Sequence, residues 1–116
     1  MKIALVSCSS KKRAYPCAAK QMYQPSQLFS LSYQYAKQHA DRIYILSAKY
    51  GLLDEDQVIK PYDMALKDMP ENRQEDWANY VLSQMRDLFD LEKDTFMILA
   101  GRDYYKNLIP SLSHYT

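Results

Sequence analysis

A chain of 116 residues fits one domain and leaves no room for two. Apolar residues make up 47% of it and charged residues 25%, the balance of an ordinary folded protein, which argues against disorder. With 15 basic and 14 acidic side chains the net charge is +1, so no overall field drives nucleic-acid or membrane binding, and only a local basic patch could do so.

The first part of the chain predicts a strand, a loop and a helix. Lys2–Ser7 is continuously apolar over four residues and then turns polar, which is typical of a buried strand. Ser9–Tyr23 has no clear period and contains a proline, so we expect a loop. A helix is expected from Ser26 to about Ala40. Its apolar face is formed by residues at three- and four-residue spacing, namely Leu28, Leu31, Tyr35 and Ala36.

The middle of the chain predicts a second strand and an irregular segment. Ile43–Ser47 is apolar and begins with a β-branched residue, as buried strands do. Lys49–Leu53 contains a glycine and is expected to be a turn. The acidic stretch Asp54–Asp56 is expected to lie in solvent, and Val58–Tyr62 to be extended or irregular around its proline.

Two further helices are expected around a third strand. Asp68 is expected to cap a helix, with Pro70 in its first turn and Glu71 completing a capping box. The buried stripe of that helix is expected to contain Trp77, Tyr80, Val81, Met85 and Leu88. Phe96–Ala100 then predicts the third strand, and Arg102–Leu112 a last helix that its proline ends.

Strands that alternate with helices predict a fold of the α/β class with a parallel sheet and right-handed crossovers. We expect one domain over residues 1–116, with three α/β/α layers around a small, mainly parallel sheet of three or four strands. So small a sheet leaves a face that a further strand or a second copy of the chain would cover, so a homodimer is an open possibility.

The apolar runs and the cysteine spacing argue against a membrane protein, a secreted protein and a metal-binding protein. The runs Ile3–Val6 and Phe96–Ala100 are too short to cross a bilayer, and the first is too short for a secretory signal. We therefore expect a soluble cytoplasmic protein with no membrane partner. Cys8 and Cys17 lack the CxxC spacing, and both histidines lie far from them in the sequence. We expect free thiols, no metal and no cofactor.

Each predicted strand ends in a polar loop, at the sheet edge where α/β proteins bind ligands. The first loop offers hydroxyls and two lysines, which suit an anion, and the other two each bring a cation, a glycine and tyrosine. A solvated polar turn is the simpler alternative. The expected ligand-binding residues are Ser7, Ser9, Ser10, Lys11, Lys12, Ser47, Lys49, Tyr50, Gly51, Gly101, Arg102 and Tyr104, together with Tyr62 from the segment Pro61–Asp63.

This combination predicts the class of ligand. Lys11, Lys49 and Arg102 are expected to point into one shared cavity from neighbouring strand ends and to hold phosphate there together with Lys12. Aromatic faces, such as that of Tyr50, stack on planar bases. A nucleotide, nucleobase or nucleic-acid terminus therefore fits better than a sugar or a lipid. The chain has only two glycines, and each is expected to mark a backbone position that a side chain would obstruct.

Two residues are candidates for catalysis. Asp63 could act as a general base or bind a ribose hydroxyl, or it could cap the turn that follows it. Cys8 directly follows the first strand, where nearby lysines and backbone amides would stabilise a thiolate. No histidine lies near it in the sequence, and a small residue that fits a tight turn is the alternative.

Several motifs resemble a known superfamily. The run Leu46–Leu52, followed by Pro61–Asp63, resembles the YaaA-like superfamily, in which Leu-Ser-Gly-x-Tyr-Gly-Leu-Leu precedes Pro-Tyr-Arg. A small bacterial and phage family of unknown function is more similar, with Ser-Cys-Ser-Lys-Lys, Leu-Ser-Ala-Lys-Tyr-Gly-Leu, Pro-Tyr-Asp and Ala-Gly-Arg-x-Tyr. Ser7–Lys12, with one extra serine, and Ala100–Tyr104 match its first and last motifs, so the resemblance spans nearly the whole chain.

The resemblance implies a ligand related to nucleic acid. The superfamily includes a peroxide-stress protein linked to DNA binding and domains of deazaguanine nucleic-acid modification systems. This sequence has Ala48 where the superfamily has glycine and Asp63 where it has arginine. We also expect it to lack the added helical DNA-binding region of the stress protein, so binding of nucleic acid is left open here.

Three hypotheses follow. The first is an enzyme that acts on a nucleotide or a modified base, at an N-glycosidic bond or by group transfer. It uses Asp63 for acid–base chemistry, with Cys8 as second candidate, and Tyr50 or Tyr62 to stack on the base. The second is a non-catalytic nucleotide-binding protein, such as a phage-encoded protein that sequesters a signalling nucleotide. The third is an interaction module that dimerises through tyrosine-rich faces.

Overall fold

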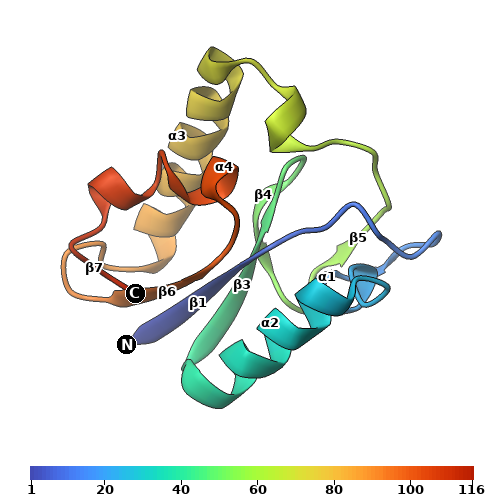
Figure 1. The fold of residues 1–116 in the computed structure, drawn as a ribbon. Helices are drawn as coiled ribbons and strands as arrows, with labels where there is room; N and C mark the ends of the chain where they lie inside the picture. Colours follow the sequence, from blue (N-terminus) through green and yellow to red (C-terminus); the bar gives the residue numbers. More distant parts are fainter.

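A five-stranded sheet forms the centre of the computed structural model, which describes residues 1–116 (Figure 1). Its order is β4-β3-β1-β6-β7, in which β4 is antiparallel to β3 and all other neighbours are parallel. The strands span Lys2–Ser7 (β1), Arg42–Ser47 (β3), Gly51–Asp54 (β4), Thr95–Leu99 (β6) and His114–Tyr115 (β7). The predicted α/β class and mainly parallel sheet are confirmed, but the expected strand number of three or four is too low.

Helices cover both faces of this sheet, which gives the expected three layers. In Figure 1, α2 lies on one face and α3 on the other, and α4 lies on the same side as α3. The helices span Ala19–Met22 (α1), Gln27–His39 (α2), Glu71–Leu88 (α3) and Arg102–Tyr105 (α4), and short 3-10 turns occupy Leu66–Asp68 (η1) and Ile109–Ser111 (η2). A second, two-stranded sheet pairs Cys17–Ala18 (β2) with Val58–Ile59 (β5). No helix combines the length and the apolar character that crossing a membrane requires.

The alternation of side chains along β1 divides the core into two clusters. Ile3 and Leu5 are fully buried on the α3 side of the sheet, and Ala4 and Val6 are buried on the α2 side. A central parallel strand that is covered on both faces needs a continuous apolar run, because neither face meets water. This is why the run at residues 3–6 predicted β1 correctly.

Two strands and one helix differ from the expectations. Residues 48–50 alone form the turn after β3, and Gly51–Asp54 returns as β4 with Ser47 opposite Gly51. The two-residue strand β7 was not expected. The predicted helix Arg102–Leu112 is wrong over most of its length, because α4 ends at Tyr105 and a separate 3-10 turn follows.

The predicted faces of α2 and α3 also need correction. Of the four residues on the expected apolar face of α2, only Ala36 is buried, and Phe29 provides the other buried contact. Leu28, Leu31 and Tyr35 are exposed. In α3, Trp77, Val81 and Met85 are buried as expected, whereas Tyr80 and Leu88 are exposed.

Two local predictions about acidic residues are wrong. Pro70, rather than Asp68, is the N-cap residue of α3, and no side chain caps this helix. Asp68 belongs to the preceding 3-10 turn, so the capping box does not form. Glu55 was expected in solvent, but it accepts a hydrogen bond from the Tyr33 hydroxyl and lies 3.8 Å from the ammonium of Lys37. It therefore ties α2 to the end of the β3–β4 hairpin.

Candidate functional site

The strand order creates a crevice between the carboxyl ends of β1 and β6. After β1 the chain passes through α2 to β3 on one side of it, and after β3 it passes through α3 to β6 on the other side. The loop after β1 leads toward α2 on one face of the sheet, and the loop after β6 leads to α4 on the face that α3 covers (Figure 1). The two loops therefore leave the sheet toward opposite faces. Ligands of open α/β sheets bind at such a switch point, because the diverging loops leave a hollow there.

A cavity of about 320 Å³ occupies this crevice, and we name it the switch-point cavity. The end of β1, the end of β6 and the start of α2 contribute its walls. Its lining residues are Ser7, Cys8, Ser9, Ser26, Leu28, Phe29, Ser32, Leu99, Ala100 and Gly101. None of them carries a formal charge. The cavity therefore offers hydroxyl groups and apolar surface to a neutral ligand group.

The first turn of α2 faces this cavity. Ser26 is its N-cap, and the Ser26 hydroxyl accepts a hydrogen bond of 3.2 Å from the amide of Phe29. Backbone amides at the start of a helix carry a partial positive charge, which favours electronegative ligand atoms. The sequence did not single out Ser26 or Ser32, because a lone serine in a helix is not a motif.

A second cavity of about 210 Å³ adjoins the first, and we name it the charged cavity. Its lining residues are Cys8, Ser9, Ser10, Lys12, Asp63, Met64, Ala65, Lys67, Asp103 and Tyr104. Cys8 and Ser9 line both cavities. Both catalytic candidates, Cys8 and Asp63, thus border one cavity together with two lysines. Lys67 was missed, because a single lysine in an irregular segment gives no pattern.

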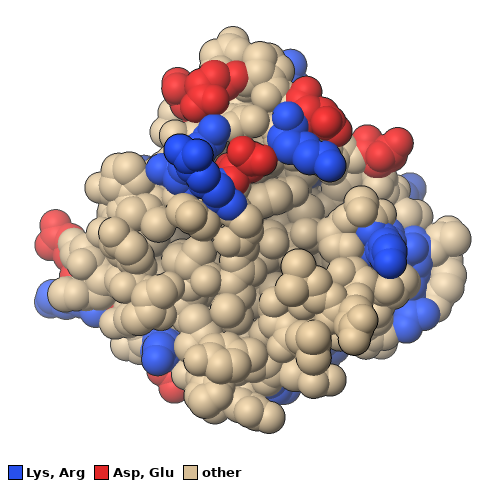
Figure 2. All heavy atoms as spheres, viewed as in Figure 1, with Lys and Arg blue, Asp and Glu red and all other residues tan.

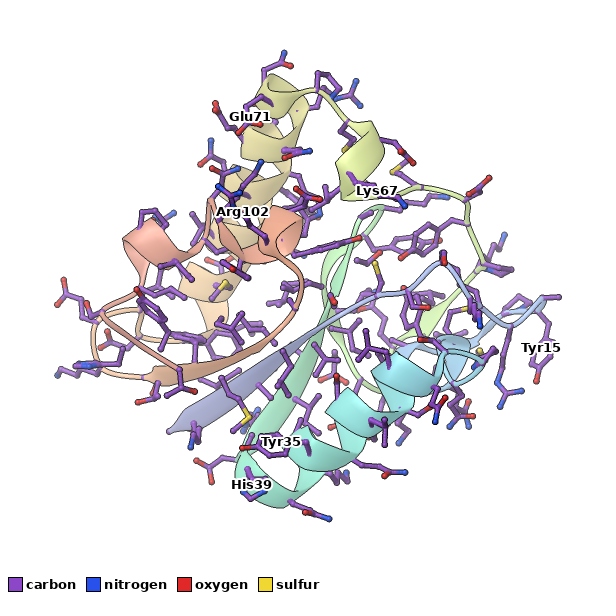
Figure 3. All side chains as sticks on the ribbon, viewed as in Figure 1. Tyr15, Tyr35, His39, Lys67, Glu71 and Arg102 are labelled. Carbon is purple, nitrogen blue, oxygen red and sulfur yellow. The ribbon has the colours of Figure 1, made fainter.

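The cations are arranged differently from the prediction. Lys11, Lys49 and Arg102 line neither cavity, so these three do not converge as expected, and the lysines that meet are Lys12 and Lys67. The Lys49 ammonium lies 5.3 Å from the ring centroid of Tyr50 instead. Figure 3 shows Arg102 on α4 and Lys67 on η1 as separate groups at the same end of the molecule.

Tyrosine hydroxyls form a buried cluster next to the charged cavity. The hydroxyls of Tyr23 and Tyr62 lie 2.6 Å apart, and the Ser47 hydroxyl donates to that of Tyr62 at 2.8 Å. Burial raises the pKa of both tyrosines above the ordinary value, so both stay protonated at neutral pH. The Lys12 ammonium lies 4.5 Å from the ring centroid of Tyr62, which holds this cation at the cavity wall.

Ser47 has a structural role in the turn after β3. It is fully buried, and its hydroxyl accepts hydrogen bonds from the amides of Lys49 at 3.3 Å and Tyr50 at 3.0 Å. Its carbonyl oxygen accepts a hydrogen bond of 2.8 Å from the indole nitrogen of Trp77. The hydroxyl and the carbonyl of Ser47 are thus engaged within the protein, and the residue lines neither cavity.

Cys8 is held by Tyr104, the fifth and last residue of the motif Ala100–Tyr104. Its sulfur lies 3.2 Å from the hydroxyl of Tyr104, and the Tyr104 ring packs edge-on against Trp77 with centroids 5.5 Å apart. Burial, followed by the neighbouring Cys8, raises the pKa of Tyr104. The neutral tyrosine hydroxyl can therefore donate to the sulfur. Asp63 is exposed and lines the charged cavity together with Cys8.

The two glycines have different roles. Gly51 has φ = 77°, and a Cβ there would lie 2.5 Å from the Gln84 side-chain oxygen and 2.8 Å from the Tyr80 ring. It is therefore required by packing against α3. At Gly101, φ is −70° and a Cβ would meet no protein atom within 4 Å, so the expectation of obstruction is wrong there. Because Gly101 lines the switch-point cavity, the protein itself gives no reason for its missing side chain.

No group of three or more His, Cys, Asp or Glu side chains is arranged to hold a metal ion.

Comparisons with known proteins give a family but no characterised relative. Searches of curated proteins and of solved structures find no significant match. A model of a family of unknown function, DUF6884, matches residues 3–116. This agrees with the expected family of unknown function, whereas the relationship to the YaaA-like superfamily stays a prediction. The chain belongs to the DUF6884 family.

Proposed function

We propose that this protein binds a nucleotide, with the base or nucleoside in the switch-point cavity and the phosphate in the charged cavity. The observation that carries the proposal is the contrast between two adjoining cavities, one without formal charge and one lined by two lysines, Lys12 and Lys67, and two aspartates, Asp63 and Asp103. A nucleotide has the same two parts. The resemblance of the loop motifs to the YaaA-like superfamily supports a nucleobase ligand as well.

The dimensions support a ligand of this size. The switch-point cavity, at about 320 Å³, lies at the lower end of the ~300–1,000 Å³ typical of small-molecule sites. Together with the charged cavity it leaves room for a mononucleotide. Cys8 and Ser9 belong to both walls, so one ligand can extend from one cavity into the other without crossing the protein.

The charges support a phosphate. Neither Lys12 nor Lys67 forms an ion pair within 4 Å, so both ammonium groups are available to an anion. Asp63 and Asp103 line the same cavity and can accept hydrogen bonds from sugar hydroxyls. Figure 2 shows the positive residues of this face in separate groups around an uncharged, hollowed centre. A small anionic ligand fits this pattern better than a long nucleic acid, which needs a continuous positive stripe.

The test compares two lysine pairs by isothermal titration calorimetry with nucleosides and their 5′-monophosphates. Lys12→Met/Lys67→Met removes the cavity pair, and Lys11→Met/Lys49→Met removes an equal charge outside both cavities. We expect the first double variant to weaken monophosphate binding tenfold or more, since a charge-assisted hydrogen bond contributes about 1.5–3 kcal/mol, and to leave nucleoside binding unchanged. Equal weakening by both double variants, or no binding of any nucleotide at millimolar concentration, refutes the proposal.

Catalysis is a second candidate, favoured by the shared position of Cys8 and Asp63 on one cavity. In this version Asp63 supplies acid–base chemistry and Cys8 a nucleophile for N-glycosidic cleavage or group transfer. The Cys8→Ser and Asp63→Asn variants would then bind the nucleotide but not turn it over. Recovery of every bound nucleotide unchanged from the wild-type protein, after denaturation, supports a binding protein without catalysis.

A further inference from the structure

The helix α2 carries a second apolar stripe that points away from the sheet. Leu28, Leu31 and Tyr35 are 75%, 57% and 50% exposed, although Phe29 and Ala36 already provide the buried contacts of the helix. The outward residues are three and four positions apart. That alternation is the spacing of a seam that packs against another helix. An isolated exposed leucine needs no explanation, but three in register form a patch.

A groove continues this patch onto the sheet. On this side α2 packs against β1, β3 and β6, and no helix lies over the edge strand β7 (Figure 1). The groove has a volume of about 660 Å³, and its lining residues are Lys2, Leu31, Ser32, Tyr35, Met97, Ile98, Leu99 and Thr116. An α/β sheet usually has both faces covered, so this part of the sheet lacks a layer.

We propose that a second copy of this chain docks on the stripe and groove, with the two α2 helices packed across a two-fold axis. Identical surfaces that meet at a two-fold axis bring equal charges together, so a charged patch would repel its copy. The stripe has no charged residue, Lys2 is the one charged residue that lines the groove, and Figure 2 shows the surface over α2 uncharged across its centre. Exposed glutamines at Gln27, Gln34 and Gln38 can form reciprocal hydrogen bonds at its margin.

The stripe supplies a large share of the area that such a dimer needs. If a fully exposed leucine or tyrosine offers about 200 Å², the three stripe residues leave about 350 Å² of mostly apolar surface. Each partner of a standard interface buries about 800 Å². The stripe alone thus provides nearly half of the required area at its apolar centre, and the groove and the glutamines provide the margin.

Docking would also complete the switch-point cavity. Leu28 belongs to the stripe and to that cavity, and Ser32 and Leu99 line both the cavity and the groove. A second copy seated on the stripe therefore forms the missing outer wall of the cavity. This part of the inference rests on the proposed function, because it predicts that nucleotide binding and dimerisation strengthen each other.

The first test measures the molar mass without any ligand, by sedimentation velocity and light scattering. We expect wild-type protein at about twice the chain mass of 13.6 kDa and Leu31→Glu at the chain mass. The matched control is Leu88→Glu, because Leu88 is 55% exposed on α3, far from the stripe, and it should stay dimeric. Tyr35→Glu provides an independent variant of the stripe, and circular dichroism checks that each variant is folded.

The outcomes separate this inference from the proposed function. A monomeric wild type at 0.5 mM, or a Leu31→Glu variant that stays dimeric, overturns the docking surface whatever the protein binds. For the coupling, we expect Leu31→Glu to weaken binding of nucleoside 5′-monophosphates about tenfold, although Leu31 does not line the switch-point cavity. Equal affinity of monomer and dimer overturns the coupling, and a dimer that binds no nucleotide overturns the proposed function but supports the docking surface.

Discussion

Replacement of Gly51 by alanine tests whether this residue supports the fold or binds a ligand. At φ = 77°, an alanine costs about 1–2 kcal/mol from the clash of its Cβ with its own backbone. The same Cβ would lie 2.5 Å from the side-chain oxygen of Gln84. That amide accepts from the Leu52 nitrogen at 2.8 Å and donates to the Leu52 oxygen at 3.2 Å. Displacing it costs about 1 kcal/mol for each hydrogen bond.

The total predicts that Gly51→Ala lowers the free energy of unfolding by about 3–4 kcal/mol, which corresponds to a fall of roughly 12–16 °C in Tm for a domain of this size. Urea and thermal denaturation measure it. Gly101→Ala is the matched control, because its φ of −70° suits alanine and its Cβ would meet nothing within 4 Å. It should be neutral, or more stable by about 0.5 kcal/mol, since alanine restricts the unfolded chain.

A mutant cycle separates the two contributions. In a Tyr80→Ala/Gln84→Ala background both clashing side chains are absent, so Gly51→Ala should then cost only the backbone penalty of about 1–2 kcal/mol. If Gly51→Ala costs less than about 0.5 kcal/mol in the wild-type background, the packing argument is refuted and Gly51 regains its place as a ligand candidate.

Three further predictions concern buried polar groups. Ser47→Ala removes the acceptor of two turn amides and the donor to Tyr62, and should lower stability by about 1–3 kcal/mol in urea denaturation; an unchanged midpoint would contradict its structural role. Ser26→Ala removes the N-cap of α2 and should lower the free energy of unfolding by about 1 kcal/mol, measured in the same way. Ser26→Asn should keep most of this stability, because asparagine also caps helices. Because the pKa values of Tyr23 and Tyr62 are raised in the folded state, their contribution to stability is complete below the ordinary tyrosine pKa of about 10 and is lost as the pH rises above it. Absorbance near 295 nm should show these tyrosines ionising only with unfolding, and their ionisation at pH 10 in folded protein would contradict the buried cluster.

The strands that the sequence predicted are those with a local signal. Continuous apolar runs mark β1, β3 and β6, because both faces of β1 and β3 are buried and Phe96 and Met97 of β6 are buried as well. By contrast, β4 is defined by its pairing with β3, which involves Gly51 opposite Ser47, and β7 has only two exposed residues. Pairing partners do not appear in the periodicity of one segment, so these strands could not be predicted from it.

The faces of helices and the directions of long side chains were also beyond the sequence. Phe29 and Leu28 are neighbours in α2, and a shift of one residue, or 100°, decides which of them meets the sheet. The loops after β1 and β6 were correctly expected to share a sheet edge, since backbone topology dictates this. Whether Lys11 or Lys12 points into the hollow depends on contacts such as that with the Tyr62 ring, which only the folded structure shows.

Cys8 lines both compartments, and this makes its thiol a reporter of both. Any occupant of either compartment would shield it from a thiol-specific reagent, and a label attached to it would block both compartments at once. The other thiol, Cys17, lies in the small sheet with β5 and lines neither compartment. In a Cys17→Ser background, the rate of alkylation therefore measures occupancy directly, before the chemical identity of the occupant is established.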